Sequence, residues 1–242
     1  AAPARPPAAS PAPIRSPAAS PSRAAGGVVN LPRLGTYTYD LSGRTQSPVL
    51  GLPQSYPAGA VLSIDFFERN APGAGQGAGQ GAGQGAGTEV AARATSPQDQ
   101  AQNTTRWIWE PSRVLLAFSN LTFAGLASYD CPYAPPPEIL PIPIRAGALP
   151  AQSWSGSQCS GDIQVTVLGM ETVSAAGRTW DAWRIDTVLH YVAQSSVDVM
   201  TDTTSLFSPE LGTAVTADAT TSGKVAGQAF SAHQVTRLTS HP

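Results

Sequence analysis

The sequence predicts a mainly β protein built from antiparallel strands, with little helix. Between Asp162 and Val215, apolar and polar residues alternate over four consecutive segments, which is the two-residue period of half-buried strands. Short turns such as 174–179 and 208–212 separate these segments, so neighbouring strands are expected to pair antiparallel. No segment has a convincing 3.6-residue period, which argues against helices.

The run that begins at Trp180 shows the alternation most clearly. Its apolar face is Trp183, Ile185, Leu189 and Tyr191, and its polar face is Arg184, Asp186 and His190. In the following run, Val197, Val199, Thr201 and Thr203 alternate with Asp198, Asp202 and Thr204. One buried and one solvated face is typical of a strand in an antiparallel meander.

The remaining segments are expected to add strands to this meander. We predict strands over 36–41, 62–67, 89–96, 106–110, 114–118, 120–126 and 229–238. Residues 114–118 are apolar at nearly every position, which suits a strand covered on both faces. The dense prolines of 132–150 exclude both a helix and a central strand, so we expect an ordered crossing between two halves.

Composition divides the chain into an arm and one folded domain. Residues 1–27 are almost entirely Ala, Pro and Ser, and such a segment is expected to be disordered. In an exported protein it would serve as a spacer, and a terminus without a role is the alternative. Residues 28–242 suffice for a single β-rich domain. Within them, the Gly-Ala-Gln repeat at 71–88 predicts a flexible loop.

Charge and hydropathy exclude several classes of partner. The net charge is −2 and 12% of residues are charged, so nothing indicates binding to nucleic acid or to an anionic membrane surface. No apolar run approaches the roughly 20 residues of a membrane span. The sequence shows no signal peptide, so if the protein is exported we expect this to be the processed chain.

Cys131 and Cys159 are the two cysteines of the chain, and we predict a structural disulfide between them. Closing the loop of about 29 residues would stabilise the fold by roughly 3 kcal/mol. Two buried free thiols are the alternative. Neither a Cys-x-x-Cys spacing nor a nearby histidine supports a redox or zinc role. An even pair in a Thr/Ser-rich β protein favours an oxidising compartment.

No catalytic motif is present. The sequence lacks a Gly-x-Ser-x-Gly elbow, a His-Glu-x-x-His pair and a phosphate-binding Gly loop. His190 lies four residues after Asp186, about 13 Å along a strand, so a catalytic pair would need a partner from a neighbouring strand. His233 and His241 lie in or beyond the last strand. We therefore predict no catalytic residue and no cofactor.

Three aspartates are candidates for a metal site. Asp198, Asp202 and Asp218 could meet across strands, but they lack the spacing of a calcium-binding loop. A solvated acidic face explains them better, and we predict no metal site.

The aromatic residues are the candidate ligand-binding set. We single out Trp107, Trp109, Trp154, Trp183, Tyr37 and Tyr39. Large rings dominate β cores, so core packing is one interpretation. The other is that some of them line the concave side of an incompletely closed sheet, where they would form an apolar groove for an acyl chain.

Four short segments resemble a known group of proteins. They are Leu34-Gly35-Thr36-Tyr37-Thr38-Tyr39, Ile144-Arg145-Ala146-Gly147 before Trp154, Gly169-Met170-Glu171-Thr172-Val173 before Gly177, and Leu206-Phe207-Ser208-Pro209-Glu210-Leu211-Gly212. Together, over roughly 34–238, they resemble uncharacterised exported actinobacterial proteins, some of them lipoproteins. The second half is similar to the TapB-like domain of unknown function. The Gly-Ala-Gln insert and the cysteine pair depart from that pattern, and the lipobox cysteine of a lipoprotein is absent.

The resemblance implies a fold and a location but no chemistry. The implied fold is a single antiparallel sheet curled into a half-barrel, similar to the LolA/LolB lipoprotein carriers. The implied location is extracytoplasmic, either secreted or associated with the cell envelope. The family has no agreed catalytic residues, so none is assigned here.

Three functions follow from these expectations. The first is a non-enzymatic cell-envelope protein that binds a lipid or another apolar ligand in a concave groove of the sheet. The second is a structural or assembly subunit of an envelope or cell-surface complex. The third is a hydrolase that uses His190 or His233.

Overall fold

A computed structural model of the chain describes residues 28–46, 54–70, 87–96, 102–123, 127–194 and 196–242. Within these ranges the secondary structure is entirely β: fifteen strands belong to one antiparallel sheet, and no helix occurs. The predicted arm at 1–27 and nearly all of the predicted Gly-Ala-Gln loop lie outside the described residues. The predicted fold class is confirmed.

The strands fall into two halves and a crossing. The first half is β1 (Gly35–Gln46), β2 (Gln54–Ser55), β3 (Val61–Asn70), β4 (Thr88–Thr95), β5 (Gln102–Glu110), β6 (Arg113–Phe123) and β7 (Ala127–Pro132). The crossing holds β8 (Glu138–Pro141), β9 (Gly147–Ala148) and β10 (Gln152–Ser155). The second half is β11 (Cys159–Ala175), β12 (Arg178–Ala193), β13 (Val197–Ser208), β14 (Thr213–Val225) and β15 (Gln228–Ser240).

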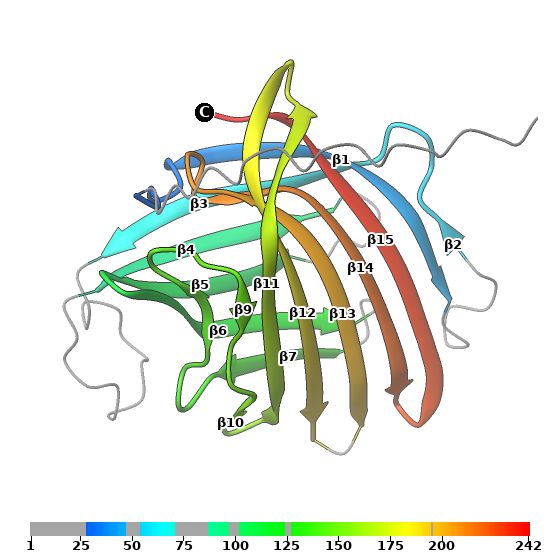
Figure 1. Cartoon of the computed structure of the whole chain (residues 1–242). Coiled ribbons are helices and arrows are strands. Elements are labelled where there is room, and N and C mark those ends of the chain that lie inside the picture. The colour runs from blue at the N-terminus through cyan, green and yellow to red at the C-terminus, as the bar shows by residue number, and fades with distance from the viewer. Residues whose placement is uncertain (1–27, 47–53, 71–86, 97–101, 124–126, 195) are drawn as a thin grey trace, which may run out of the picture.

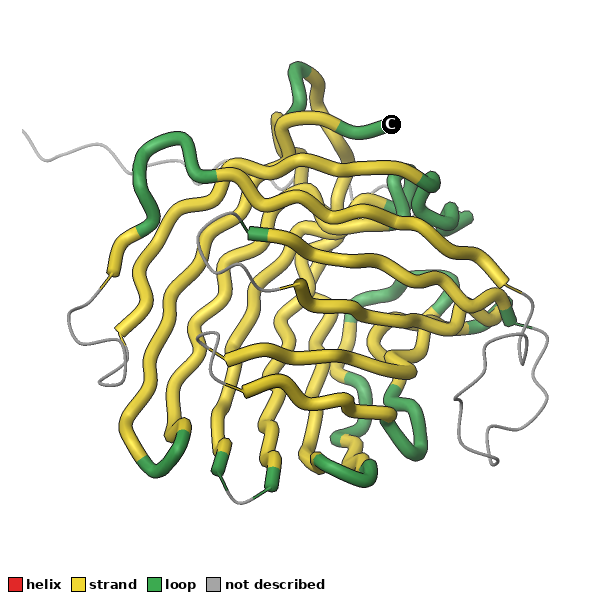
Figure 2. Tube along the Cα trace, turned by 180° about the vertical axis from the view of Figure 1, so that it is seen from behind, coloured by secondary structure: helices red, strands yellow, loops and turns green. Residues whose placement is uncertain are grey.

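The first and last long strands join the two halves into one sheet. Its order is β10-β11-β12-β13-β14-β15-β1-β3-β4-β5-β6-β7, with β2, β8 and β9 paired beside this path. The sheet curls, so that β11–β15 form a front wall and β3–β7 a back wall that runs across it (Figures 1 and 2). The result is a half-barrel whose concave face lies between the two walls.

Two glycines, one in β1 and one in β14, lie where a neighbouring strand approaches the backbone closely. Gly43 in β1 has φ +129° and Gly223 in β14 has φ +150°. A Cβ atom at Gly43 would lie 1.9 Å from the carbonyl oxygen of His233, and one at Gly223 would lie 2.1 Å from that of Asp198. Only glycine permits so close an approach of the neighbouring strand, and glycine kinks of this kind generate curvature in β-sheets.

The two edges of the curled sheet meet along a seam. Cys131 and Cys159 form the predicted disulfide there. Beside it, Ala134 and Ser155 exchange two backbone hydrogen bonds of 3.1 and 3.0 Å. The Gln152 side chain completes the seam, since it accepts from the backbone N–H of Glu138 at 2.8 Å and donates to the Glu138 carbonyl at 2.9 Å.

Buried side chains gather in three clusters along the concave face. The seam cluster includes Tyr129, Cys131, Tyr133, Trp154, Cys159 and Tyr191. The β1 cluster includes Tyr37, Tyr39, Phe66, Val90, Trp180, Val215 and Leu238. The β11 cluster includes Val114, Leu140, Ile144, Ile163, Val165, Val167 and Ile185.

Residues 28–34 run across one end of the half-barrel as a strap. Val29 packs against the β11 cluster and Leu31 against the β1 cluster. The backbone N–H of Asn30 donates to the carbonyl of Pro209 at 2.9 Å, and that of Arg33 donates to the Tyr37 hydroxyl at 3.0 Å. The strap therefore holds two of the three clusters together.

Most predicted strands are confirmed, and several regions differ. The short strands β2, β7 and β10 were not predicted. The strand expected at 114–118 and the described part of the one expected at 120–126 form one strand, β6, because Ser119 and Asn120 continue the ladder by pairing with Cys131 and Asp130 of β7. Residues 124–126 lie outside the described residues. The proline-rich crossing contains two short strands that were not predicted. β8 and β9 add to β6 and β11 beside the main path, where a missing proline N–H is tolerated.

Candidate functional site

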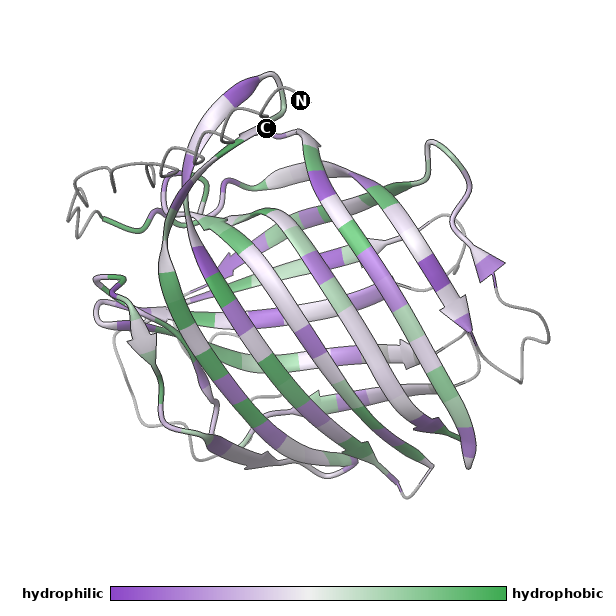
Figure 3. Ribbon diagram, turned by 45° about the vertical axis from the view of Figure 1, so that its right-hand side comes forward, coloured by the Kyte–Doolittle hydropathy of each residue, from purple (hydrophilic) through white to green (hydrophobic). Residues whose placement is uncertain are grey.

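The concave face of the sheet carries the candidate site, because two of the predicted aromatic residues, Trp107 and Trp109, lie together on it. Figure 3 shows hydrophobic and hydrophilic positions alternating along the front-wall strands. In β12 and β13 the residues that face inward are those predicted from the sequence, including Ile185, Leu189, Val197 and Val199. Asp186, His190 and Asp198 lie on the opposite, convex face.

Trp107 occupies the centre of the concave face. It packs against all three clusters, and its neighbour Trp109 packs against the β1 and β11 clusters. The ring of Phe66 links Trp107 to Tyr37, with centroid distances of 6.0 Å and 5.1 Å. Both tryptophans come from β5, where they alternate with outward-facing Arg106 and Ile108.

The other predicted aromatics occupy separate parts of the core. Tyr37 and Tyr39 are fully buried in the β1 cluster, and Trp154 is buried in the seam cluster. Trp183 packs partly buried against the β11 cluster. The structure therefore brings Trp107 and Trp109 together on the concave face and distributes the other four around it. Ligand binding by this set stays a prediction.

Burial raises the pKa of several of these tyrosines. Desolvation is the main cause for Tyr37, Tyr39, Tyr133 and Tyr191. The Tyr39 hydroxyl donates to the carbonyl of Ala214 at 2.9 Å, and that of Tyr191 lies 2.6 Å from Sγ of Cys131. These hydroxyls therefore keep their protons at neutral pH.

Several large apolar side chains on the concave face stay partly exposed. They are Leu62, Ile64, Trp107, Trp109, Leu189, Phe207 and Phe230. Each packs against at least one buried cluster. The indole N–H of Trp109 has no hydrogen-bond partner in the described part of the chain. The concave face thus offers an aromatic and aliphatic floor that other side chains leave partly uncovered.

A second group of inward-facing residues was not predicted as part of the site. We call it the hydroxyl wall, and its members are Thr201, Thr203 and Ser205 of β13, Ala217, Ala219 and Thr221 of β14, Ala232, Gln234 and Thr236 of β15, and Gly43 and Thr45 of β1. All of them are partly exposed. The sequence signal was weak because threonine occupies both faces, as at the consecutive Thr203 and Thr204.

Two histidine–aspartate pairs lie on the convex face. His190 Nε2 is 2.9 Å from Asp198 Oδ1, and His233 Nε2 is 2.9 Å from Asp218 Oδ1. As expected, the partners come from neighbouring strands. Both pairs are open to solvent, and among the described residues no serine, threonine or cysteine side chain is hydrogen-bonded to either ring.

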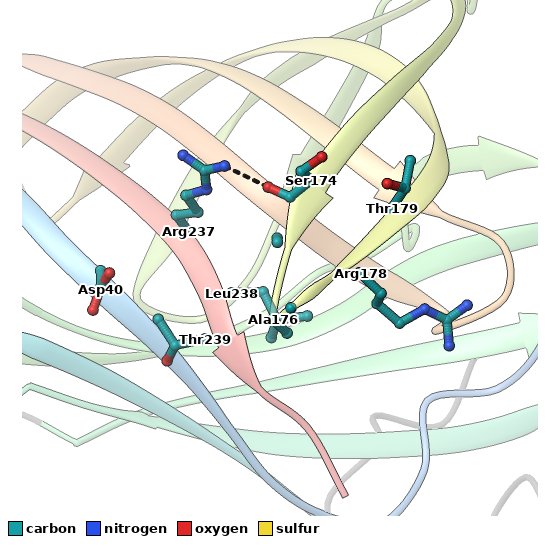
Figure 4. A pocket seen from close by; sticks show the side chains of 10 residues that line it. Asp40, Ser174, Ala176, Arg178, Thr179, Arg237, Leu238 and Thr239 are labelled. Carbon is teal, nitrogen blue, oxygen red and sulfur yellow. Dashed lines mark hydrogen bonds between the residues drawn. The ribbon is translucent and has the colours of Figure 1, made fainter.

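Two shallow hollows lie away from the concave face. One, of about 450 Å³, lies beside the projecting β11–β12 hairpin (Figure 4). Its arginines are already engaged: Arg237 donates to the Ser174 carbonyl, and Arg178 binds Glu210 and stacks on Trp180 at 3.8 Å. The other, of about 440 Å³, lies on the convex face and includes Asp186, Asp202 and Asp218.

The described residues show neither a metal-ligand cluster nor a membrane-spanning helix. They contain no group of three or more His, Cys, Asp or Glu side chains placed to hold a metal ion. They also contain no helix that is long and apolar enough to span a membrane.

Comparisons with known proteins show two structural likenesses. No protein family and no curated protein sequence matches the chain. A lipoprotein candidate from Parabacteroides distasonis is similar at a TM-score of 0.41 and 12% identity, over 86% of this chain and 97% of the other. An exported-protein candidate with a YmcC-like fold from Bacteroides fragilis is similar at a TM-score of 0.36 and 8% identity, over 87% and 98%. Likeness at this level carries no inference, and the resemblance to actinobacterial proteins with a TapB-like half stays a prediction.

Proposed function

We propose that this protein is a non-enzymatic, extracytoplasmic component of the cell envelope that holds the apolar chain of a lipid against its concave face. The observation that carries the proposal is the partial exposure of Trp107 and its apolar neighbours on the concave face. Apolar surface gains roughly 25 cal/mol for each Å² that is removed from water, so a lipid chain lying over these residues would bind favourably.

The disulfide supports the extracytoplasmic part of the proposal. Cys131 and Cys159 are bonded, and structural disulfides persist mainly in oxidising compartments. The bond also fixes the seam, which keeps the concave face in one shape. A rigid site binds its ligand with a smaller loss of conformational entropy than a mobile one.

The test is binding of an uncharged polarity-sensitive dye, Nile red, followed by displacement with hexadecanol. We expect dye fluorescence to rise on addition of the protein and to fall as hexadecanol displaces it. Ala232→Trp fills the concave face and should weaken dye binding at least tenfold. Ser231→Trp is the matched control, because Ser231 is exposed on the convex face of the same strand. Absence of a fluorescence change, or equal losses in both variants, would contradict the proposal.

The same material tests the non-enzymatic part. His190→Ala and His233→Ala should leave any turnover of ester substrates by the purified protein unaltered. A loss of turnover in either variant would favour the hydrolase alternative. If Nile red is not taken up, the structural or assembly role becomes the preferred function, and cross-linking in the source organism would then identify the complex.

A further inference from the structure

The hydroxyl wall is a surface of small, uncharged residues, in which six threonine or serine hydroxyls and the Gln234 amide are interspersed with alanine and glycine. Cross-strand pairing sets its residues in rows: Thr201 pairs with Thr221, and Thr203 with Ala219. Ala219 in turn pairs with Gln234 of β15. Three rows about 7 Å apart on four strands about 4.8 Å apart give a patch roughly 14 Å square. This is wide enough for a head group of one or two sugar rings.

Charge is sorted strictly between the two faces of these strands. Asp186, Asp198, Asp202, Asp218 and Lys224 all take convex positions. So do Arg44 and His233, which pair with each other across β1 and β15. At the inward-facing positions of β1, of β13–β15 and of residues 185–193 in β12, no charged side chain occurs.

The wall retains hydrogen-bonding capacity. Thr201 and Thr221 share a hydrogen bond of 3.0 Å between their hydroxyls. Within the described ranges, the hydroxyls of Thr203 and Thr45 have no partner. A threonine hydroxyl both donates and accepts, as does a ligand hydroxyl, so the two can satisfy each other. A charged head group would lose hydration on this wall without gaining an opposite charge.

We propose that the lipid held on the concave face carries an uncharged, hydroxyl-bearing head group that lies against the hydroxyl wall. This inference rests on the proposed function, because it assigns the head group of the same ligand. The apolar chain lies over the Trp107 floor, and the head group lies over β13–β15. Anionic and cationic lipids of the same chain length are rejected.

The test compares five probes that share one hexadecyl chain. They are hexadecyl glucoside, 1-hexadecyl glycerol, hexadecanoate, hexadecylamine and hexadecane, each used to displace Nile red. We expect the glucoside and the glycerol ether to bind at least tenfold more tightly than the two charged probes. Equal affinity across the panel would overturn the head-group assignment and leave the proposed function standing. If no probe displaces the dye, the proposed function itself fails.

Variants of the hydroxyl wall test whether this surface binds the head group. Thr203→Val removes one hydroxyl with little change of shape, and we expect about a 3- to 10-fold loss for the glucoside without a change for Nile red. Thr220→Val is the control on the convex face of the adjacent strand. Ala219→Asp adds a charge to the wall and should shift preference from the glucoside to hexadecylamine. Unchanged selectivity in Thr203→Val and Ala219→Asp, with both variants folded by circular dichroism, would overturn the proposal.

Discussion

Cys131 of β7 is disulfide-bonded to Cys159 of β11, although the two strands are not neighbours in the sheet order. The bond spans a sequence separation of 28 residues and brings the Cα atoms within 5.8 Å. Tyr133, Trp154 and Tyr191 pack around it, with ring centroids 4.3 Å and 5.8 Å from Trp154. At this point of the seam, the two edges of the sheet are joined by a disulfide inside a buried aromatic cluster. In a completely closed barrel, a continuous ladder of backbone hydrogen bonds would join them instead.

Removing this link should destabilise the protein substantially. We expect the double variant Cys131→Ala, Cys159→Ala to lose about 3 kcal/mol of unfolding free energy, because its unfolded chain is no longer restricted. Urea unfolding followed by tryptophan fluorescence measures the loss. Wild-type protein treated with a reductant is the control and should show a similar decrease. An unchanged urea midpoint in both would contradict the structural role of the disulfide.

The glycine kink in β1 should tolerate no side chain. Gly43→Ala places a Cβ 1.9 Å from the His233 carbonyl oxygen at a φ of +129°, so the strands must separate. We expect a loss of about 3 kcal/mol or more from combined strain and overpacking. Gly169→Ala is the matched control, because nothing lies within 4 Å of its Cβ position, and it should stay within about 0.5 kcal/mol of wild type. If the two variants were equally stable, the claim that the close strand approach at Gly43 requires glycine would be wrong.

Trp180 is buried and Trp109 is partly exposed, and the two also differ in how their N–H groups are satisfied. Trp180 Nε1 donates to the Ala175 carbonyl at 3.0 Å, whereas Trp109 Nε1 has no partner in the described chain. Trp180→Phe removes more buried surface than Trp109→Phe does, and only Trp180→Phe breaks a hydrogen bond. We expect Trp180→Phe to be about 1–2 kcal/mol more destabilising than Trp109→Phe in thermal or urea unfolding. The reverse order would show that Trp109 makes an unrecognised polar contact.

Alkaline conditions should unfold the protein through its buried tyrosines. Tyr39 and Tyr191 have pKa values raised by burial, so above about pH 10 the unfolded state holds fewer protons than the folded state. The contribution of these tyrosines to the free energy of unfolding is therefore complete below about pH 10. As the pH rises further, the free energy of unfolding falls by up to about 1.4 kcal/mol per pH unit for each such tyrosine. Urea midpoints at about pH 8 and pH 11, with tyrosinate absorbance, measure this fall. If the absorbance showed that every tyrosine ionises near its ordinary pKa while the sheet stays folded, this prediction would be wrong.

The sequence predicted strands well where the two faces of a strand differ sharply in polarity. In β12, Ile185, Leu189 and Tyr191 face the core while Asp186 and His190 face solvent, as the alternation indicated. Ser119 misled the prediction, since a polar residue after an apolar run reads as a strand end. In the structure Ser119 is 5% exposed and continues β6 by pairing with Cys131.

Long-range features of the candidate site were less accessible to sequence reasoning. Trp107 and Trp109 were singled out by residue type, but their convergence with Leu189 and Phe230 depends on how the sheet curls. The hydroxyl wall was missed because Ala, Thr and Gly residues in β14 show little contrast between faces. The pairing of β1 with β15 has no local signal, since no nearby turn connects these strands.

That pairing also sets the order in which the chain can fold. The Thr239 hydroxyl donates to the Thr38 carbonyl at 3.0 Å across 201 residues of sequence. The hairpins of β11–β15 form between neighbours and can appear early, but β1 must wait for the final strand to be synthesised. Until then one long edge of the nascent first half stays unpaired and open to association with other chains. We therefore expect slow folding, in which β1 is synthesised first but completes its pairing among the last strands.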